Sequence, residues 1–254
     1  LEELGVKTMF AYPGGFSLEL HQALSKSPIR VILPRNEQGG AFGADGFARM
    51  SGEVGVCMAT SGPGATNLLT GVADCYMDSI PVVFITGQVP ADMIGKNVFQ
   101  ETDIIGMTRP VVKHSYLVLD AADIPRILRE AFYLAKSGRP GPVLVDIPKN
   151  VQQQIAMVDL NAEMDLPSYF LPSKPAAADI DRIKAMIKIS KRPCIYIGGG
   201  IISSGSSAEL RKFAESYNIP VVSTLMGLGA FPEDHPLSLR WLGMHGMAYA
   251  NYAA

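Results

Sequence analysis

The sequence predicts an α/β protein built on a doubly wound parallel sheet, followed by the first part of a second α/β unit. Two observations support this fold class. Short apolar runs alternate with longer helical patterns, and the runs at 81–86 and 142–147 are apolar throughout. Strands buried on both faces have this composition. Ligands of such sheets bind beyond the carboxyl ends of the strands, so the loops after the strands form the candidate site.

The first domain is expected to cover residues 1–150. Its strands are predicted where short β-rich runs occur, at 8–11, 30–33, 55–59, 81–86, 113–119 and 142–147. Its helices are predicted where the apolar spacing is helical, at 15–26, 37–51, 64–78 and 121–137. Residues 1–5 read as the end of an amphipathic helix whose start is missing.

Residues 151–177 are predicted to be a linker because Gln152-Gln153-Gln154 is followed by Pro167, Pro172 and Pro175 with little periodicity. Residues 178–254 then begin a second unit. Its predicted elements are a helix at 178–190, a strand at 194–197, a glycine turn at 198–200, a helix at 206–217 and a strand at 219–222. Two or three strands are too few for a finished domain, so we expect a fragment of a longer protein, cut at both ends.

Composition excludes several classes of partner. Charged residues make up 18% and hydrophobic residues 48%, with a formal net charge of -2, so there is no basic face for nucleic acid or an anionic membrane. Cys57, Cys75 and Cys194 are too scattered for a disulfide framework, and no CxxC pair could hold a metal. The uncharged run at 54–73 is broken by Ser61-Gly62-Pro63-Gly64, which argues against a membrane span. Small molecules are the expected partners.

Glu37 is an isolated carboxylate just past an apolar strand, among the small residues of segment 34–49. It has two interpretations. A lone acid at this position suits catalysis, whereas an acid at the start of a helix also stabilises the helix N-terminus. This segment alone slightly favours the helix-start interpretation.

Three loops after strands share one design: 12–15, 61–67 and 86–90 are rich in Gly and Pro. Glycine lets the backbone approach a ligand, and the helix N-termini behind these loops offer unpaired N–H donors. Each loop alone is explained by an ordinary turn, but their convergence on one sheet edge favours a site. The dinucleotide pattern GxGxxG after the first strand and the P-loop pattern GxxxxGK[ST] are both absent from the sequence.

Taken together, eight segments resemble the pyrimidine-binding domain of thiamine-diphosphate enzymes. They are Ala11-Tyr-Pro-Gly-Gly, Pro34-Arg-Asn-Glu-Gln-Gly, Ala59-Thr-Ser-Gly-Pro-Gly-Ala-Thr-Asn67, Ile85-Thr-Gly-Gln-Val-Pro, Phe99-Gln-Glu-Thr, Lys113-His, Gly138-Arg-Pro-Gly-Pro-Val and Asp146-Ile-Pro-Lys. With Ser223-Thr-Leu-Met-Gly-Leu-Gly and Leu242-Gly-Met-His-Gly, they resemble the catalytic subunits of the acetolactate synthase (acetohydroxyacid synthase) family. The resemblance implies a second unit that is an incomplete, Rossmann-like central domain associated with flavin adenine dinucleotide (FAD).

The resemblance also implies the site residues. The glutamate matching Glu37 hydrogen-bonds a pyrimidine nitrogen of thiamine diphosphate and favours the imino tautomer, which removes the thiazolium proton. Gln100 would lie near the cofactor and the reacting carbonyl, and Lys149 would lie at the substrate entrance. The remaining cofactor-binding residues implied are Pro13, Gly15, Pro63 and Asn67 for the pyrimidine, and Arg139, Gly199, Thr224, Leu225, Met226, Gly243, Met244 and His245 for FAD. The implied substrate or inhibitor channel comprises Phe16, Pro90, Val98, Phe99 and Lys149.

Phe16 stands where many relatives carry a small residue, so an altered inhibitor response is expected. Residue type alone favours structural roles for His21, His114 and Cys57, and makes Met226 and Met244 core filler as readily as ligand neighbours.

The implied activity is condensation of pyruvate with pyruvate or 2-oxobutyrate to 2-acetolactate or 2-aceto-2-hydroxybutyrate, in branched-chain amino-acid biosynthesis. The cofactors would be thiamine diphosphate, a structural FAD and Mg2+, whose ligands are expected outside this chain because it contains no Gly-Asp-Gly. A homodimer or tetramer with active sites between subunits is implied, a regulatory subunit is left open, and the chain alone is expected to be inactive. The compartment would be cytoplasmic in a bacterium and a plastid or mitochondrion in a eukaryote. The alternatives are another thiamine-diphosphate carboligase, decarboxylase or oxidase, or a noncatalytic α/β binding module.

Overall fold

A computed structural model describes residues 1–172 and 174–254 of the protein. The chain forms two compact units, Leu1–Leu171 and Pro172–Ala254. No helix in the described part of the chain is both long and apolar enough to cross a bilayer.

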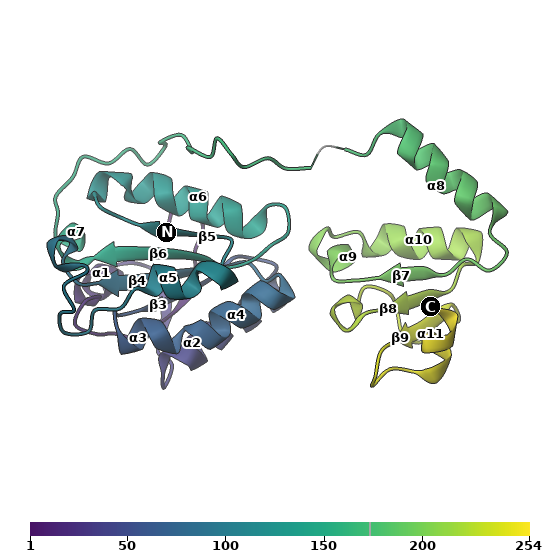
Figure 1. Cartoon of the computed structure of the whole chain (residues 1–254), viewed down its shortest axis with the longest axis horizontal. Helices are drawn as coiled ribbons and strands as arrows, with labels where there is room; N and C mark the ends of the chain where they lie inside the picture. Colours follow the sequence, from purple (N-terminus) through teal and green to yellow (C-terminus); the bar gives the residue numbers. More distant parts are fainter. Residues whose placement is uncertain (173) are drawn as a thin grey trace. The chain divides into compact units, whose positions relative to one another are not determined.

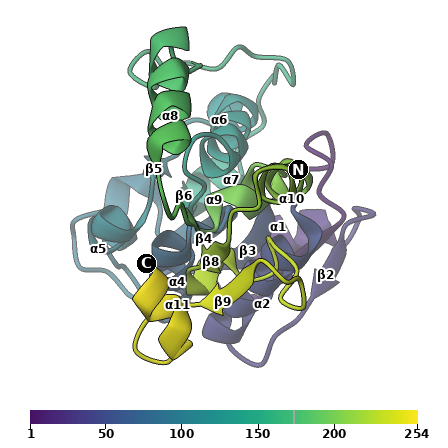
Figure 2. The same ribbon diagram turned by 90° about the vertical axis from the view of Figure 1, so that its right-hand side faces the viewer.

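The first unit contains a six-stranded sheet in the order β2-β1-β3-β4-β6-β5, with every pair parallel. Its strands are β1 (Thr8–Ala11), β2 (Arg30–Ile32), β3 (Gly55–Ala59), β4 (Val82–Gln88), β5 (His114–Leu117) and β6 (Val143–Pro148). Every residue of β3, β4 and β6 is buried. β2 and β5 lie at opposite edges of the sheet (Figure 2) and are partly exposed. The predicted parallel sheet is confirmed.

Helices cover both faces of this sheet, with α6 on one side and α2, α3 and α4 on the other (Figure 1). One face carries α1 (Leu18–Leu24), α6 (Ile124–Lys136) and α7 (Lys149–Gln152). The other carries α2 (Glu37–Ser51), α3 (Pro63–Asn67), α4 (Leu69–Asp78) and α5 (Ile104–Thr108). Short 3-10 turns are η1 (Ala91–Met93), η2 (Arg109–Val111) and η3 (Ala121–Asp123). The sheet is therefore doubly wound, as predicted.

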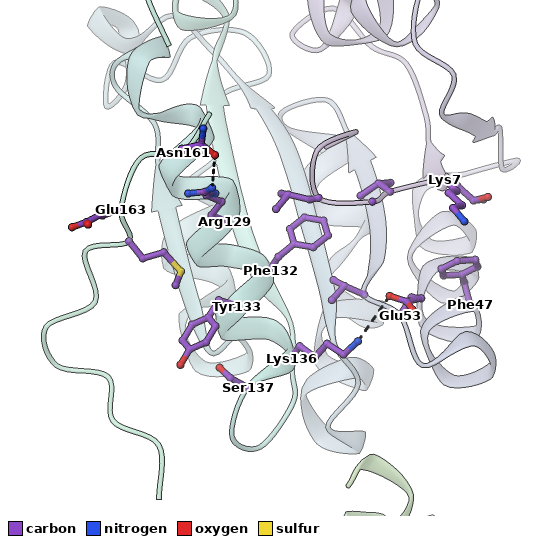
Figure 3. Close-up of a pocket in the computed structure, with 16 residues that line it drawn as sticks. Lys7, Phe47, Glu53, Arg129, Phe132, Tyr133, Lys136, Ser137, Asn161 and Glu163 are labelled. Atoms are coloured by element: carbon purple, nitrogen blue, oxygen red, sulfur yellow. Dashed lines mark hydrogen bonds and ion pairs between the residues drawn. The ribbon is translucent and has the colours of Figure 1, made fainter. Parts of the chain in front are cut away.

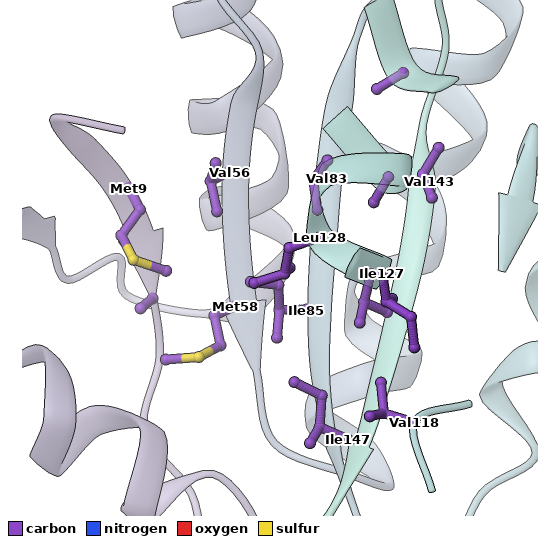
Figure 4. Close-up of a cluster of buried hydrophobic side chains, with 14 of the residues drawn as sticks. Met9, Val56, Met58, Val83, Ile85, Val118, Ile127, Leu128, Val143 and Ile147 are labelled. Carbon is purple, nitrogen blue, oxygen red and sulfur yellow. The ribbon is translucent and has the colours of Figure 1, made fainter. Parts of the chain in front are cut away.

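The hydrophobic core lies on both faces of the sheet. Figure 4 shows one face, where Ile127 and Leu128 of α6 pack onto strand residues that include Val83 and Ile85. On the other face α2 approaches the sheet through small residues: a Cβ on Gly55 would meet the backbone oxygen of Ala44. Cys57 lies in this second layer at 1% exposure, which confirms its predicted place in the core.

α2 begins and ends where the sequence predicts because both of its ends are capped. The Asn36 side chain accepts a hydrogen bond from Gly39 N at 2.8 Å, and Gly52 ends the helix in the left-handed region at φ 71°. Other predicted helices are shorter or divided. Segment 64–78 is split at Leu68 into α3 and α4, and segment 121–137 begins as η3 before α6.

Residues 2–5 form a turn that has the backbone pattern of a helix end, as predicted for residues 1–5. Gly5 N donates to Glu2 O, Val6 N donates to Leu1 O, and Gly5 lies in the left-handed region at φ 77°.

The second unit contains a three-stranded parallel sheet in the order β7-β8-β9. Its strands are β7 (Ile195–Ile197), β8 (Val221–Ser223) and β9 (Ser238–Trp241). Its helices are α8 (Ala177–Ile189), α9 (Gly200–Ser203), α10 (Ser207–Tyr217), η4 (Leu225–Gly227) and α11 (Ala248–Ala253). β9 was not predicted because it is short and contains Arg240 in the left-handed region at φ 59°.

Much of the segment predicted as a linker packs with the first unit. The three consecutive glutamines each reach a different partner: Gln152 Nε2 donates to Phe16 O, Gln153 Nε2 to Glu19 Oε1, and Gln154 Oε1 accepts from Ala121 N. Further along, Asp165 N donates to the buried Glu130 carboxylate of α6 at 2.8 Å. The division between the units falls after Leu171.

Candidate active site

The candidate site lies at the carboxyl edge of the six-stranded sheet, where the strand order reverses. The chain passes from β1 outward to β2 and returns to β3 on the other side of β1. In doubly wound sheets this switch point forms a ligand-binding crevice. The loops after β1 and β3 meet there, because Phe16 N donates to Thr60 Oγ1 at 3.1 Å and a Cβ on Gly14 would meet the Thr60 side chain.

Glu37 and Asn67 form a pair beside this switch point. Glu37 is the first residue of α2, Asn67 is the last residue of α3, and Asn67 Nδ2 donates to Glu37 Oε2 at 2.9 Å. Gly64 brings the α3 backbone close to the carboxylate: a Cβ at Gly64 would stand 3.3 Å from Glu37 Oε1 and 2.7 Å from Thr60 Cγ2. Glycine is therefore required where the two segments approach.

The structure agrees with the helix-start interpretation of Glu37 and leaves room for the other. Glu37 lies in the first turn of α2, where a negative charge stabilises the helix N-terminus, while Asn36 supplies the side-chain cap and the Glu37 carboxylate accepts from Asn67. The carboxylate also lies near the buried Cys57, since burial and then the charge of Glu37 raise the pKa of that thiol. The Glu37 carboxylate is half-buried, and its Oε2 accepts a hydrogen bond from the Asn67 amide.

Gln100 lies in a tightly held loop after β4. Its backbone is in the left-handed region at φ 59°, which is uncommon for a residue other than glycine. Its carbonyl oxygen lies 2.7 Å from the point where a Cβ on Gly62 would stand, so the loop crowds the turn after β3. The Glu101 carboxylate holds the preceding residues because it accepts hydrogen bonds from Gly95 N and Val98 N. These bonds lower the pKa of Glu101, and the bond from Gly95 N contributes most. The neighbouring Phe99 is 81% exposed.

Lys149 lies at the end of β6 and reaches the loop after β1. Its Nζ donates to Gly15 O at 3.0 Å and stands 5.7 Å from the centroid of the Phe16 ring, a cation–π distance. Glu19 Oε1 lies 3.8 Å from the same nitrogen. The residue after Pro90 is tied to this region as well, because Ala91 N donates to Asn150 Oδ1 at 2.8 Å.

The structure brings together most residues that the resemblance implies for the first unit, but not Arg139. The residues near one another at the carboxyl edge are Pro13, Gly15, Phe16, Glu37, Pro63, Asn67, Pro90, Val98, Phe99, Gln100 and Lys149. Arg139 precedes β6, at the amino edge. Its guanidinium donates to Ser79 Oγ at 2.7 Å and to Met77 O at 3.3 Å, at the end of α4.

The residues implied for FAD in the second unit follow its three strands. The Thr224 hydroxyl accepts from Gly227 N at 3.1 Å, and a Cβ on Gly199 would stand 3.2 Å from Met226 O, so the turns after β7 and β8 pack together. Gly243 follows β9, and its N–H donates a hydrogen bond to Asn251 Oδ1 at 2.8 Å. Leu225, Met244 and His245 are exposed beside these turns. The second unit thus offers small and apolar residues at one sheet edge.

A large hollow of about 1170 Å³ lies at the opposite, amino edge of the first sheet (Figure 3). Arg129, Phe132 and Lys136 of α6 line one side, and Glu53, before β3, stands 3.9 Å from Lys136. None of the expected site residues lines it. Its size therefore does not identify it as the active site.

Sequence patterns did not indicate two residues that hold the loops of the site. Thr60 joins the loops after β1 and β3, and Gln152 binds both Phe16 O and Ile147 O at 2.8 and 2.7 Å. Thr60 directly precedes the Ser-Gly-Pro-Gly turn, a position that could have indicated it. His21 and His114 keep local contacts: His21 Nδ1 lies 2.8 Å from Ser17 O, and the His114 ring packs edge-on against Tyr116.

Comparison with known proteins agrees with this architecture. The N-terminal TPP binding domain of thiamine pyrophosphate enzymes matches residues 1–107, and the central domain of these enzymes matches residues 180–254. Over its full length the chain is 58% identical to acetolactate synthase 3, chloroplastic, of Brassica napus, 57% identical to acetolactate synthase, chloroplastic, of Arabidopsis thaliana, and 58% identical to acetolactate synthase 1, chloroplastic, of Zea mays. It spans 38% to 40% of the length of these relatives.

Proposed function

This chain belongs to the thiamine pyrophosphate enzyme family, and we propose that the whole protein is an acetolactate synthase. The reaction proposed is condensation of two pyruvates to 2-acetolactate with loss of carbon dioxide. Condensation of pyruvate with 2-oxobutyrate to 2-aceto-2-hydroxybutyrate is proposed as a second activity. The observation that supports this function best is the Glu37 carboxylate, paired with Asn67 Nδ2 at 2.9 Å beside the switch point of the sheet.

The residues at the switch point are proposed to hold the aminopyrimidine end of thiamine diphosphate. Because Gly64 has no side chain, α3 can pack closely against Thr60 and the Glu37 carboxylate. Pro13, Gly15 and Pro63 belong to the loops around Glu37 and would line the ring. When bound, the cofactor supplies the nucleophilic carbon and the electron sink for loss of carbon dioxide.

Glu37 is proposed to hold a proton between its carboxyl group and a ring nitrogen of the cofactor. Asn67 Nδ2 donates to Oε2, so Oε2 acts as an acceptor. Oε1 makes no hydrogen bond with any described residue of the chain. A proton on the carboxyl group would therefore reside at Oε1, the oxygen that remains available to a ligand.

Lys149 and Gln100 are proposed to act on the substrate side. The Lys149 ammonium is bound by Gly15 O and stands near the Phe16 ring, so it places a positive charge where a 2-oxo acid carboxylate would enter. Gln100 is proposed to present its amide to the reacting carbonyl, with Val98, Phe99 and Pro90 along the same channel. Phe16 would narrow that channel.

FAD and Mg2+ are further parts of the proposal. FAD would bind along the turns containing Gly199, Thr224 and Gly243 and serve a structural role. The described residues contain no group of three His, Cys, Asp or Glu side chains that could hold a metal ion. The sequence also lacks Gly-Asp-Gly, so the oxygen ligands that Mg2+ needs are proposed to come from another part of the whole protein.

A homo-oligomer is proposed because α2 and α4, on one face of the sheet, expose large apolar side chains. Met77 on α4 is 71% exposed, and Phe42 on α2 is also exposed. A second copy would cover such residues and complete the site between subunits. The proposal extends to a regulatory subunit, for which no surface is assigned. The names of the relatives support a plastid location for a plant parent, whereas a bacterial parent would act in the cytoplasm.

The test is Glu37→Gln in the full-length enzyme. We expect acetolactate formation from pyruvate to fall by about 10²–10⁴-fold, because the amide keeps the size of the side chain but cannot exchange the proton. Glu53→Gln is the matched control, since this exposed glutamate lies at the other sheet edge, and it should retain full activity. Near-normal activity of Glu37→Gln would favour a noncatalytic role for the domain. Product analysis, and whether FAD is reduced during turnover, would separate a synthase from a decarboxylase or oxidase.

A further inference from the structure

A buried hydrogen-bond network connects the centre of the sheet to the loop that contains Gln100. Asp146 of β6 is 1% exposed, and its Oδ1 accepts from Thr86 Oγ1 of β4 at 2.6 Å. Its Oδ2 accepts from Gln88 Nε2 at 2.9 Å. Gln88, the last residue of β4, is itself 4% exposed. Three polar side chains are therefore joined inside the sheet edge beneath the candidate site.

The amide of Gln88 has a hydrogen-bond partner for each of its polar groups. One N–H donates to Asp146, the other donates to Thr102 O at 3.0 Å, and the amide oxygen accepts from Val89 N at 2.9 Å. Thr102 is two residues after Gln100 and its carbonyl also accepts from Ile104 N, at the start of α5. Gln88 thus fixes the point at which the Gln100 loop leaves the site and enters α5.

The Gln100 loop needs such fixing because its backbone is strained. A non-glycine residue at φ 59° costs about 1–3 kcal/mol and persists only where the surroundings enforce it. On one side the backbone of Gly62 crowds Gln100, and the Glu101 carboxylate fastens the residues before it. On the other side the contact from the sheet interior is Gln88.

We propose that Gln88, held by Asp146, is a positioning residue that fixes the loop 98–102 and so aims the Gln100 side chain at the reacting carbonyl. The inference rests on the proposed function of Gln100. Burying a carboxyl group in a strand costs free energy. Burial raises the pKa of Asp146 to about 7, although the hydrogen bonds from Thr86 and Gln88 lower it. An apolar residue would fill the same space without this desolvation cost.

The test is a double-substitution cycle in the full-length enzyme. Gln88→Leu keeps the approximate volume but removes both donors, and it should lower kcat/KM for pyruvate by about tenfold or more through misplacement of Gln100. In a Gln100→Ala background the same substitution should change kcat/KM by less than about twofold, because the group that Gln88 aims is gone. The loss of kcat/KM should also divide between kcat and KM in the same way in Gln88→Leu as in Gln100→Ala.

Amide hydrogen exchange of residues 95–104 gives a readout that does not depend on turnover. Gln88→Leu should speed exchange there by about tenfold. Thr108→Val is the control for the kinetic cycle, because it removes a buried hydroxyl that bonds Ile104 O within α5. Its effect on kcat/KM should be equal in the wild-type and Gln100→Ala backgrounds. Thr86→Val, which removes one bond to Asp146, should shift the loop in the same direction as Gln88→Leu but by less, and it serves if Gln88→Leu fails to fold.

The possible failures are distinguishable. If Gln100→Ala alone leaves kcat/KM unchanged, the proposed role of Gln100 is wrong and the inference on Gln88 is overturned with it. If Gln100→Ala impairs the enzyme but Gln88→Leu reduces kcat/KM by its full factor in that background too, the role of Gln100 stands and the positioning role is refuted. Unchanged hydrogen exchange at residues 95–104 in both Gln88→Leu and Thr86→Val would refute it as well.

Discussion

Replacing Gly62 with alanine tests directly how the turn after β3 and the Gln100 loop fit together. The new Cβ would lie 2.7 Å from Gln100 O and 3.0 Å from Gln100 Cα, both backbone atoms that cannot rotate away. The loop must retreat by about 0.7 Å to reach ordinary van der Waals contact. Gly62 also has φ 57° and ψ -122°, a conformation that is costly for alanine.

The magnitude follows from these two effects. Backbone strain costs about 1–3 kcal/mol, and insertion of a methyl group into a packed contact costs about 1–3 kcal/mol more. We therefore expect Gly62→Ala to lower the free energy of unfolding by about 2–6 kcal/mol. Displacement of Gln100 should lower kcat/KM for pyruvate in the full-length enzyme by about ten- to a hundredfold.

Gly52→Ala is the matched control for Gly62→Ala. Gly52 also has a positive φ, 71°, but open space surrounds the position where its Cβ would stand. Its substitution should cost about 1–2 kcal/mol of stability and leave kcat/KM unchanged. The assays are denaturant unfolding followed by circular dichroism, and steady-state acetolactate formation. Equal kcat/KM for the two variants would refute the packing argument.

Three further predictions concern other parts of the chain. Phe16→Ala should change the inhibition constant of inhibitors that bind the substrate channel and raise KM for pyruvate about two- to tenfold through loss of the contact with Lys149; an unchanged inhibition constant would contradict the channel assignment. Asp146, with a pKa of about 7 when folded, binds a proton that the unfolded chain releases, so stability should fall as pH rises. Between about pH 5 and pH 7.5 the free energy of unfolding of wild type relative to Asp146→Asn should fall by about 2–3 kcal/mol, and a flat difference in denaturant titrations would contradict this. The isolated 254-residue chain should form no acetolactate from pyruvate, and measurable product would overturn the proposed division of the site.

The sequence predicts the elements of the first unit best where local chemistry defines both ends. α2 is the clearest case, because Asn36 and Gly52 mark its start and end. Segment 64–78 reads as one helix, but the chain divides it at Leu68 so that α3 can carry Asn67 to Glu37. α5 has only five residues and was not predicted, since it is too short to show a helical period.

The contacts within the site could not be predicted from local sequence patterns. Glu37 and Asn67 are 30 residues apart, and only the family resemblance brought them together before the structure did. The Gln152-Gln153-Gln154 run reads as a polar linker because composition does not reveal partners as distant as Phe16 and Ala121. The left-handed backbone of Gln100 has no sequence signal at all, since it depends on the packing of the loop against Gly62.

The central claim is that Glu37 activates the bound cofactor, and the most direct measurement is the rate at which the thiazolium C2 proton of thiamine diphosphate exchanges with deuterium in the full-length enzyme. NMR of the released cofactor after rapid quenching gives this rate without substrate. The account predicts that Glu37→Gln slows exchange by about 10²-fold or more while Glu53→Gln leaves it unchanged. Exchange at the wild-type rate in fully loaded Glu37→Gln enzyme would contradict the claim.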